Sequence, residues 1–154
     1  MTQANSPVQS PSLPATGGKE LSIQTFRDSP LVVYFYPRDN TPGCTREGQD
    51  FRDLYPEFEA LGCAIVGVSR DSLKTHENFK NKQEFPFELI ADADEKLCRQ
   101  FDVIKEKNMY GKKVMGIERS TFLLDAEGKI TREWRKVKVP GHAGEVLEAV
   151  RELD

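Results

Sequence analysis

The residue best suited to chemistry is Cys44, which ends the stretch PRDNTPGC directly after the apolar run LVVYFY. The other cysteines, Cys63 and Cys98, lie far from it in the sequence, so the stretch fits neither a disulfide framework nor a CxxC motif. A lone cysteine of this kind can act through its thiolate, the form of cysteine that serves as nucleophile. The sequence therefore predicts a reactive cysteine just beyond the end of a strand.

The remaining candidate groups favour structural roles. Cys63 opens the apolar stretch CAIVGVS and Cys98 lies on the inward side of EKLCRQF, so both are predicted to be structural thiols. We expect His76 at the surface or half-buried on a helix, and His142 at the start of the last helix. Because closely spaced Cys or His pairs are missing, the sequence predicts no metal site.

The start of the helix after the first strand would activate Cys44. Thr41 is a favoured N-cap residue and Pro42 suits the first helical position, which puts Cys44 in the first turn. Unpaired backbone N–H groups and the positive end of the helix dipole favour a thiolate there. Steps of four and three residues from Cys44 lead to Gly48, Phe51, Tyr55 and Phe58, so the thiol is predicted to face the core. A thiolate facing the core needs hydrogen-bond donors, which the Thr41 hydroxyl and a nearby arginine could supply.

Strands and helices alternate along the chain. Apolar runs and turn signals predict strands at 31–36, 63–69, 87–91, 120–125 and 130–137. Amphipathic periodicity predicts helices at 42–61 (bent near Pro56), 71–82, 95–101 and 143–153. The segment 103–116, rich in Lys and Gly, is predicted to be a loop.

This order of elements predicts an α/β, thioredoxin-like fold, in which helices flank a central mixed β-sheet. A flavodoxin-like fold with a fully parallel sheet is the alternative, and the hairpin formed around AEGK argues against it. In both folds the loop that carries Cys44 lies at the carboxyl edge of the sheet, where ligands bind. We expect one domain over 19–154, preceded by a flexible or hairpin lead-in over 1–18.

Composition restricts the partners. The chain has 154 residues and a formal net charge of −3, so neither nucleic acid nor an anionic membrane is expected to bind it. No apolar run approaches the roughly 20 residues of a membrane span. The first residues carry no charged side chain and do not fit a secretory signal, which favours a cytoplasmic location with reduced cysteines.

Three separated stretches carry a resemblance to a known family. Pro37, Thr41 and Cys44 match the Pro-x-x-x-Thr-x-x-Cys signature of the peroxiredoxins. Together, FYPRDNTPGCT, YGKKVMGIERSTFLLD and VPGHAGEVLEAV resemble the bacterioferritin comigratory protein subfamily, also called peroxiredoxin Q. The resemblance runs from about residue 11 to the C-terminus.

The resemblance implies a thiol peroxidase without a prosthetic group, which reduces hydrogen peroxide and organic hydroperoxides. Cys44 would be the peroxidatic cysteine and would become a sulfenic acid. Pro37 would shield it from water, and Thr41 would hydrogen-bond the thiolate and the incoming oxygen. Arg119 matches the family arginine that stabilises the thiolate and polarises the O–O bond. The subfamily is largely monomeric, so a monomer is expected.

The chain departs from the family pattern where a resolving cysteine would stand. The two usual positions are occupied by Gln49 and Lys80. Cys63, Cys98 or an external thiol must then reduce the sulfenic acid, and an internal bridge would need Cα atoms within about 7 Å. We predict a one-cysteine mechanism with thioredoxin, glutaredoxin or glutathione as reductant. A disulfide oxidoreductase, disfavoured by the missing CxxC, and a non-catalytic oxidation sensor are the alternatives.

Overall fold

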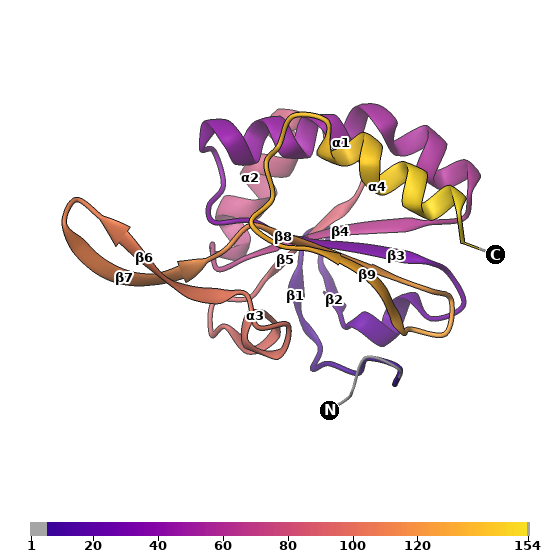
Figure 1. The fold of residues 1–154 in the computed structure, drawn as a ribbon, viewed down its shortest axis with the longest axis horizontal. Helices are drawn as coiled ribbons and strands as arrows, with labels where there is room; N and C mark the ends of the chain where they lie inside the picture. Colours follow the sequence, from indigo (N-terminus) through magenta and orange to yellow (C-terminus); the bar gives the residue numbers. More distant parts are fainter. Residues whose placement is uncertain (1–5, 154) are drawn as a thin grey trace.

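A seven-stranded sheet forms the centre of the molecule (Figure 1), and the structure, a computed structural model, describes residues 6–153. The order of the strands is β2-β1-β5-β4-β3-β8-β9. Their bounds are β1 Leu13–Ala15, β2 Lys19–Leu21, β3 Leu31–Phe35, β4 Ala64–Ser69, β5 Glu88–Ala91, β8 Ser120–Leu124 and β9 Ile130–Trp134.

The sheet is mixed. Strand β3 pairs in parallel with β4, and β4 in parallel with β5. Strand β8 pairs antiparallel with both β3 and β9, and β1 pairs antiparallel with β5 and β2. The predicted thioredoxin-like arrangement is thereby confirmed, and the fully parallel flavodoxin-like alternative is wrong.

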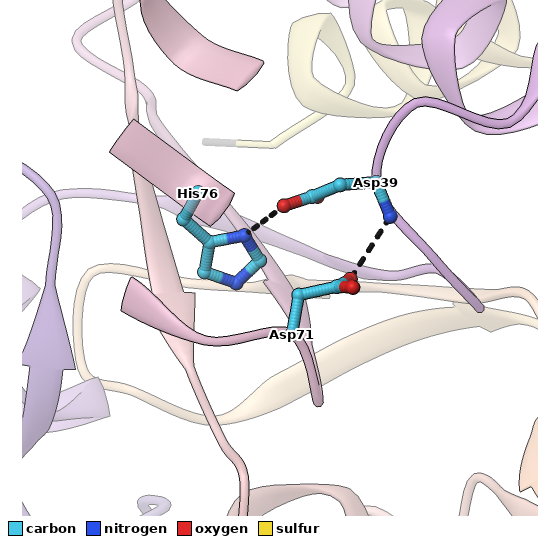
Figure 2. A group of neighbouring side chains, drawn as sticks. All are labelled: Asp39, Asp71 and His76. Carbon is cyan, nitrogen blue, oxygen red and sulfur yellow. Dashed lines mark hydrogen bonds and ion pairs between the residues drawn. The ribbon is translucent and has the colours of Figure 1, made fainter. Parts of the chain in front are cut away.

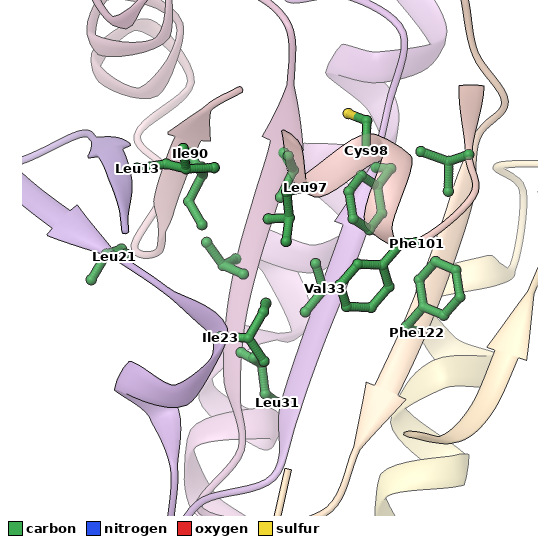
Figure 3. Packing of buried hydrophobic residues seen from close by; sticks show 14 of the residues in the cluster. Leu13, Leu21, Ile23, Leu31, Val33, Ile90, Leu97, Cys98, Phe101 and Phe122 are labelled. Carbon is green, nitrogen blue, oxygen red and sulfur yellow. The ribbon is translucent and has the colours of Figure 1, made fainter. Parts of the chain in front are cut away.

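Helices cover both faces of the sheet (Figure 1). One face carries α1 (Pro42–Ala60), α2 (Leu73–Gln83) and α4 (His142–Arg151), and the other carries α3 (Lys96–Gln100) and the 3-10 helix η2 (Ile23–Phe26). Alternate side chains of β3 enter the two cores. Val32 and Tyr34 pack beneath α1 and α4. Phe35 packs on the side of α3, as does Val33, which Figure 3 shows. The continuous apolar run of β3 is thus buried on both faces, as a central strand requires.

The segment 103–116 is a β-hairpin, so its prediction as a loop is wrong. Strands β6 (Ile104–Met109) and β7 (Lys112–Ile117) pair antiparallel and project from the body of the molecule, in orange in Figure 1. Tyr110 and Gly111 join them with φ values of 54° and 79°, the left-handed backbone of a two-residue hairpin turn. Because most of the outer hairpin is exposed on both faces, its sequence lacks the apolar alternation that signals a strand.

Among residues 6–153, none of the helices has the length and apolar character that crossing a bilayer requires.

Candidate active site

The connection from β3 to α1 places Cys44 at the carboxyl edge of the sheet. Strand β3 ends at Phe35, and α1 begins at Pro42 with Thr41 as N-cap residue, as predicted. The Thr41 side chain does not cap the helix, because its hydroxyl donates to the Arg38 carbonyl oxygen at 2.8 Å. The predicted contact between Thr41 and the thiolate therefore stays a prediction.

The Cys44 sulfur is buried and faces a cation. Cys44 is 2% exposed, which confirms that its thiol points toward the core. The Nη2 group of Arg119 donates to its Sγ at 3.5 Å. Arg119 directly precedes β8, and the pairing of Phe35 with Ser120 brings it to the end of β3 where Cys44 lies. A Cβ atom at Gly43 would lie 3.1 Å from the same Nη2, so glycine leaves room for the guanidinium.

Glu47 completes this constellation and was not singled out from the sequence. It is 1% exposed, and its Oε1 accepts from Nη1 of Arg119 at 2.6 Å, so the guanidinium bridges Glu47 and Cys44. Its spacing of three residues from Cys44 puts both side chains on one face of α1, a signal that the sequence does contain.

Glu47 and Arg119 shift each other's pKa values. Burial raises the pKa of Glu47 to about 7, although the Arg119 charge opposes the shift. Burial alone would lower the pKa of Arg119, but the negative charges of Glu47 and Cys44 raise it, so the guanidinium stays charged. A permanent cation with one N–H donor aimed at a buried sulfur can stabilise negative charge on that sulfur and on an oxygen that it attacks.

A second cluster, largely buried, links the loop ahead of α1 to α2 and to the segment that precedes α2 (Figure 2). Nδ1 of His76 lies 2.6 Å from Oδ2 of Asp39, and the Asp39 backbone N–H donates to Oδ2 of Asp71 at 2.9 Å. His76 is fully buried at 0% exposure, so its predicted place at or near the surface is wrong. The cluster was missed because its members come from separate segments that only the parallel β3–β4–β5 arrangement brings together.

One ligand atom from each of these three residues lies within 4.8 Å of the others, a spacing that could also suit a cation. Nδ1 of His76 and Oδ2 of Asp39 already bond each other, and Oδ2 of Asp71 accepts from the Asp39 backbone N–H and from the Ser69 hydroxyl. A metal would have to replace the His76–Asp39 contact, so the residues fit a hydrogen-bonded cluster better than a metal site.

His142 begins α4, as predicted, and its Nε2 lies 2.8 Å from Oγ1 of Thr121. Burial lowers the pKa of His142 to about 4, so the ring is neutral at physiological pH.

Neither of the other cysteines lies beside Cys44. Cys98 belongs to the core on the opposite face of the sheet (Figure 3). Cys63 precedes Ala64, which pairs with Leu31 at the far end of β3. At about 3.3 Å per residue, the length of β3 separates it from Cys44 by roughly 15 Å. Burial raises the pKa of Cys63 to about 12, and burial with the Asp92 carboxylate raises the pKa of Cys98 as well.

The two positions of a family resolving cysteine are tied into helix contacts. Lys80 on α2 forms an ion pair with Glu88 of β5 at 2.7 Å. Gln49 on α1 donates from Nε2 to Oε1 of Gln83 on α2 at 2.9 Å. Both side chains thus hold α2 to its neighbours.

Comparison with known proteins gives consistent relatives. A profile of the AhpC/TSA family matches residues 4–133. The chain is 59% identical over 139 residues to Peroxiredoxin Bcp of Xanthomonas campestris pv. campestris, covering 90% of this chain and 87% of the relative. It is 47% identical over 136 residues to Peroxiredoxin Bcp of Bacillus subtilis, covering 88% and 87%.

Solved structures agree with the fold. Xanthomonas campestris Peroxiredoxin Q superposes with a TM-score of 0.88 at 58% identity, covering 92% of this chain and 89% of that chain. A second structure, of the bacterioferritin comigratory protein of the same organism, has a TM-score of 0.88 at 57% identity, covering 92% and 90%. That structure belongs to a set of trapped intermediate/ligand complexes concerned with the alkyl peroxide reduction activity of the Xanthomonas protein.

The family profile covers most of the chain, and the matched relatives are peroxiredoxins over nearly their whole lengths. The fold, the sequence and the buried cysteine beside an arginine therefore lead to one assignment: the chain belongs to the AhpC/TSA family and is a thiol-dependent peroxidase of the peroxiredoxin type.

Proposed function

We propose that Cys44 is the peroxidatic residue and that Arg119 is its electrostatic partner. The observation that carries this proposal is the Arg119 guanidinium, which lies 3.5 Å from the Cys44 sulfur and is held from its other side by Glu47. The thiolate attacks the terminal oxygen of a hydroperoxide, so an S–O bond forms as the O–O bond breaks. Sulfur is oxidised to the sulfenic acid, and the departing oxygen takes up a proton and leaves as water or an alcohol.

Pro37 and Thr41 would complete the site. Pro37 is half-buried between β3 and α1, where its ring can limit the access of water to the sulfur. Thr41 lies one turn before Cys44, and rotation about its side-chain bond would move its hydroxyl from the Arg38 carbonyl toward a bound peroxide oxygen. Each fixed donor aimed at the oxygen that gains charge lowers the barrier.

The proposed substrates are hydrogen peroxide and alkyl hydroperoxides. The alkyl peroxide reduction described for the Xanthomonas relative supports the second class. The chemistry needs no cofactor, because the thiolate supplies the two electrons and a thiol reductant restores them.

We further propose that an external thiol reduces the sulfenic acid. The positions of Cys63 and Cys98, at the far end of β3 and on the opposite face of the sheet, support this one-cysteine mechanism. The thiolate of thioredoxin, glutaredoxin or glutathione attacks the sulfenic sulfur, so an S–S bond forms and the oxygen leaves as water. A second thiol then releases Cys44 from the mixed disulfide.

A monomer in a reducing compartment such as the cytosol fits this mechanism. The three cysteines are free, which suits a reducing compartment.

The test is the intact mass of the protein after one equivalent of hydrogen peroxide. Cys44→Ser, Cys63→Ser and Cys98→Ser are compared with the wild type. We expect a trappable sulfenic acid at Cys44 in every protein except Cys44→Ser. Loss of two hydrogens that disappears in Cys63→Ser or Cys98→Ser would contradict the one-cysteine mechanism, and an unreactive Cys44 would contradict the peroxidatic assignment.

A further inference from the structure

The Asp39 side chain anchors the loop that leads to Cys44. Its Oδ1 accepts from the Tyr36 hydroxyl at 2.6 Å, and its Oδ2 lies 2.6 Å from Nδ1 of His76. Its backbone N–H donates to Asp71, the residue just before the α2 N-cap. One loop residue is therefore tied to the end of β3, to α2 and to the segment between β4 and α2.

Donor and acceptor logic fixes the proton count of this cluster. Nε2 of His76 lies 2.9 Å from the Ile90 carbonyl oxygen, which can only accept, so Nε2 carries a hydrogen. Nδ1 and the Asp39 carboxyl oxygen then approach to 2.6 Å, a distance that requires one proton between them. Whether Asp39 or His76 holds that proton, the pair has zero net charge and every facing atom is bonded.

Because Asp39 and His76 are buried, loss of the contact between them is costly. Both side chains of the pair are 0% exposed, so a broken contact would leave polar atoms without water. Tyr36 is buried as well, and burial together with the nearby Asp39 charge raises its pKa well above 10.0, so its hydroxyl keeps its proton and donates. The cluster is therefore stable when all its contacts are made, and losing one member is costly.

The loop that this cluster anchors takes part in two steps, the oxidation of Cys44 by a peroxide and the reduction of its sulfenic acid by an external thiol. The first step suits a closed loop, and the second requires an open one. With Cys44 2% exposed, the closed loop keeps the sulfur beside Arg119, which suits attack on a small peroxide. A larger external thiol cannot reach a sulfenic acid in that position until the loop moves. Asn40, beside Asp39, has a φ of 65°, so the closed loop also holds a non-glycine residue in left-handed backbone.

We propose that Asp39 and His76 are positioning residues that form a clasp, and that this clasp sets the balance between the closed loop and a loop open to the reductant. The proposal rests on the proposed function, because it assigns the clasp to the two half-reactions at Cys44. A weaker clasp slows oxidation of Cys44 and accelerates reduction of its sulfenic acid by an external thiol.

A graded series of variants removes or weakens the contacts of the clasp one at a time. Tyr36→Phe removes one donor. Asp39→Asn keeps both side-chain contacts but replaces the proton-sharing carboxyl–imidazole contact by an amide–imidazole hydrogen bond. His76→Phe removes the link to α2 altogether. Glu88→Gln is the matched control, since it weakens the anchoring of α2 through Lys80 without touching the loop.

The experiment measures each half-reaction separately by rapid quench and intact mass. Reduced protein is mixed with hydrogen peroxide, and pre-oxidised protein is mixed with reduced glutathione. In Asp39→Asn we expect oxidation to slow about tenfold and reduction by glutathione to accelerate about threefold. The effects should be smaller in Tyr36→Phe, larger in His76→Phe, and absent from both steps in Glu88→Gln.

The outcomes separate the two proposals. If the wild type oxidises at Cys44 and Asp39→Asn changes neither rate, or lowers both together, the clasp does not set the balance. Should His76→Phe fail to fold, Asp39→Asn and Tyr36→Phe still give this comparison. A wild type that does not react with peroxide would instead contradict the proposed function, whatever the variants do.

Discussion

Cys44 and Cys98 occupy pockets that are equally closed to water but opposite in charge. Cys44 is 2% exposed and Cys98 is 0% exposed, on opposite faces of the same sheet. The Cys44 sulfur faces the Arg119 guanidinium, whereas Cys98 lies beside the Asp92 carboxylate, which accepts its backbone N–H at 2.7 Å. Burial by itself disfavours a thiolate. We therefore expect the neighbouring charge, rather than the depth of burial, to decide which of these two thiols reacts.

The largest effect is expected when the Arg119 cation beside the Cys44 sulfur is removed. In Arg119→Met we expect kcat/KM for hydrogen peroxide to fall by about 10²–10³, because a fixed donor to the reacting centre is lost. The loss of kcat/KM in Arg119→Lys should be smaller than in Arg119→Met. Lysine keeps the positive charge, but its ammonium group cannot bridge Glu47 and Cys44 as the guanidinium does.

Initial rates of peroxide consumption with excess thiol measure this effect. The control is Arg135→Met, which removes an arginine bound to the carbonyls of Phe101 and Asp102 on the other face. Its rate should match the wild type. Equal losses in both arginine variants would mean that the cation at Cys44 has no special effect.

A second test compares the thiols directly. Treatment of the native protein with iodoacetamide at pH 7.5 should modify Cys44 at least about 30-fold faster than Cys63 or Cys98, because the thiolate is the reacting form. Burial raises the pKa of both slower thiols. Peptide masses after timed quenching give the three rates, and modification of Cys98 as fast as Cys44 would contradict the charge argument.

A third test concerns the buried carboxyl of Glu47. Its pKa, about 7 when folded, exceeds the 4.5 of an exposed carboxyl, so between these values the folded state binds more protons than the unfolded state. The free energy of unfolding contributed by Glu47 therefore falls as pH rises from 4.5 to 7.

In Glu47→Gln this contribution is absent, so the variant should gain stability relative to the wild type across that window, by up to roughly 3 kcal/mol. Urea denaturation of both proteins at several pH values measures the difference. A difference that stays constant with pH would show that Glu47 does not titrate there.

Local signals were enough to predict most of the fold. The apolar run Leu31–Phe35, the Thr41–Pro42 start of α1 and the hairpin of β8 and β9 each have a sequence pattern that depends only on neighbouring residues. The β6–β7 hairpin has no such pattern, because its outer part packs against nothing on either side.

The site was predictable only in part, for the same physical reason. Cys44 was found from its own loop, and Arg119 from a family resemblance rather than from any local rule. Its contact with Cys44 depends on the pairing of β3 with β8, and the burial of His76 depends on the loop after β3 packing against α2. Contacts between distant segments are set by tertiary packing, which neither periodicity nor capping signals encode.

The ion pair at Lys80 constrains how this enzyme could change over evolution. Lys80 and Lys19 both bond Glu88, so a lysine at position 80 helps to join α2, β5 and the β2 strand. Substitution of Lys80 by cysteine, the simplest step toward an internal disulfide, would remove one of these cations and loosen the same helix. A two-cysteine variant would therefore need compensating changes around Glu88 to keep α2 in place.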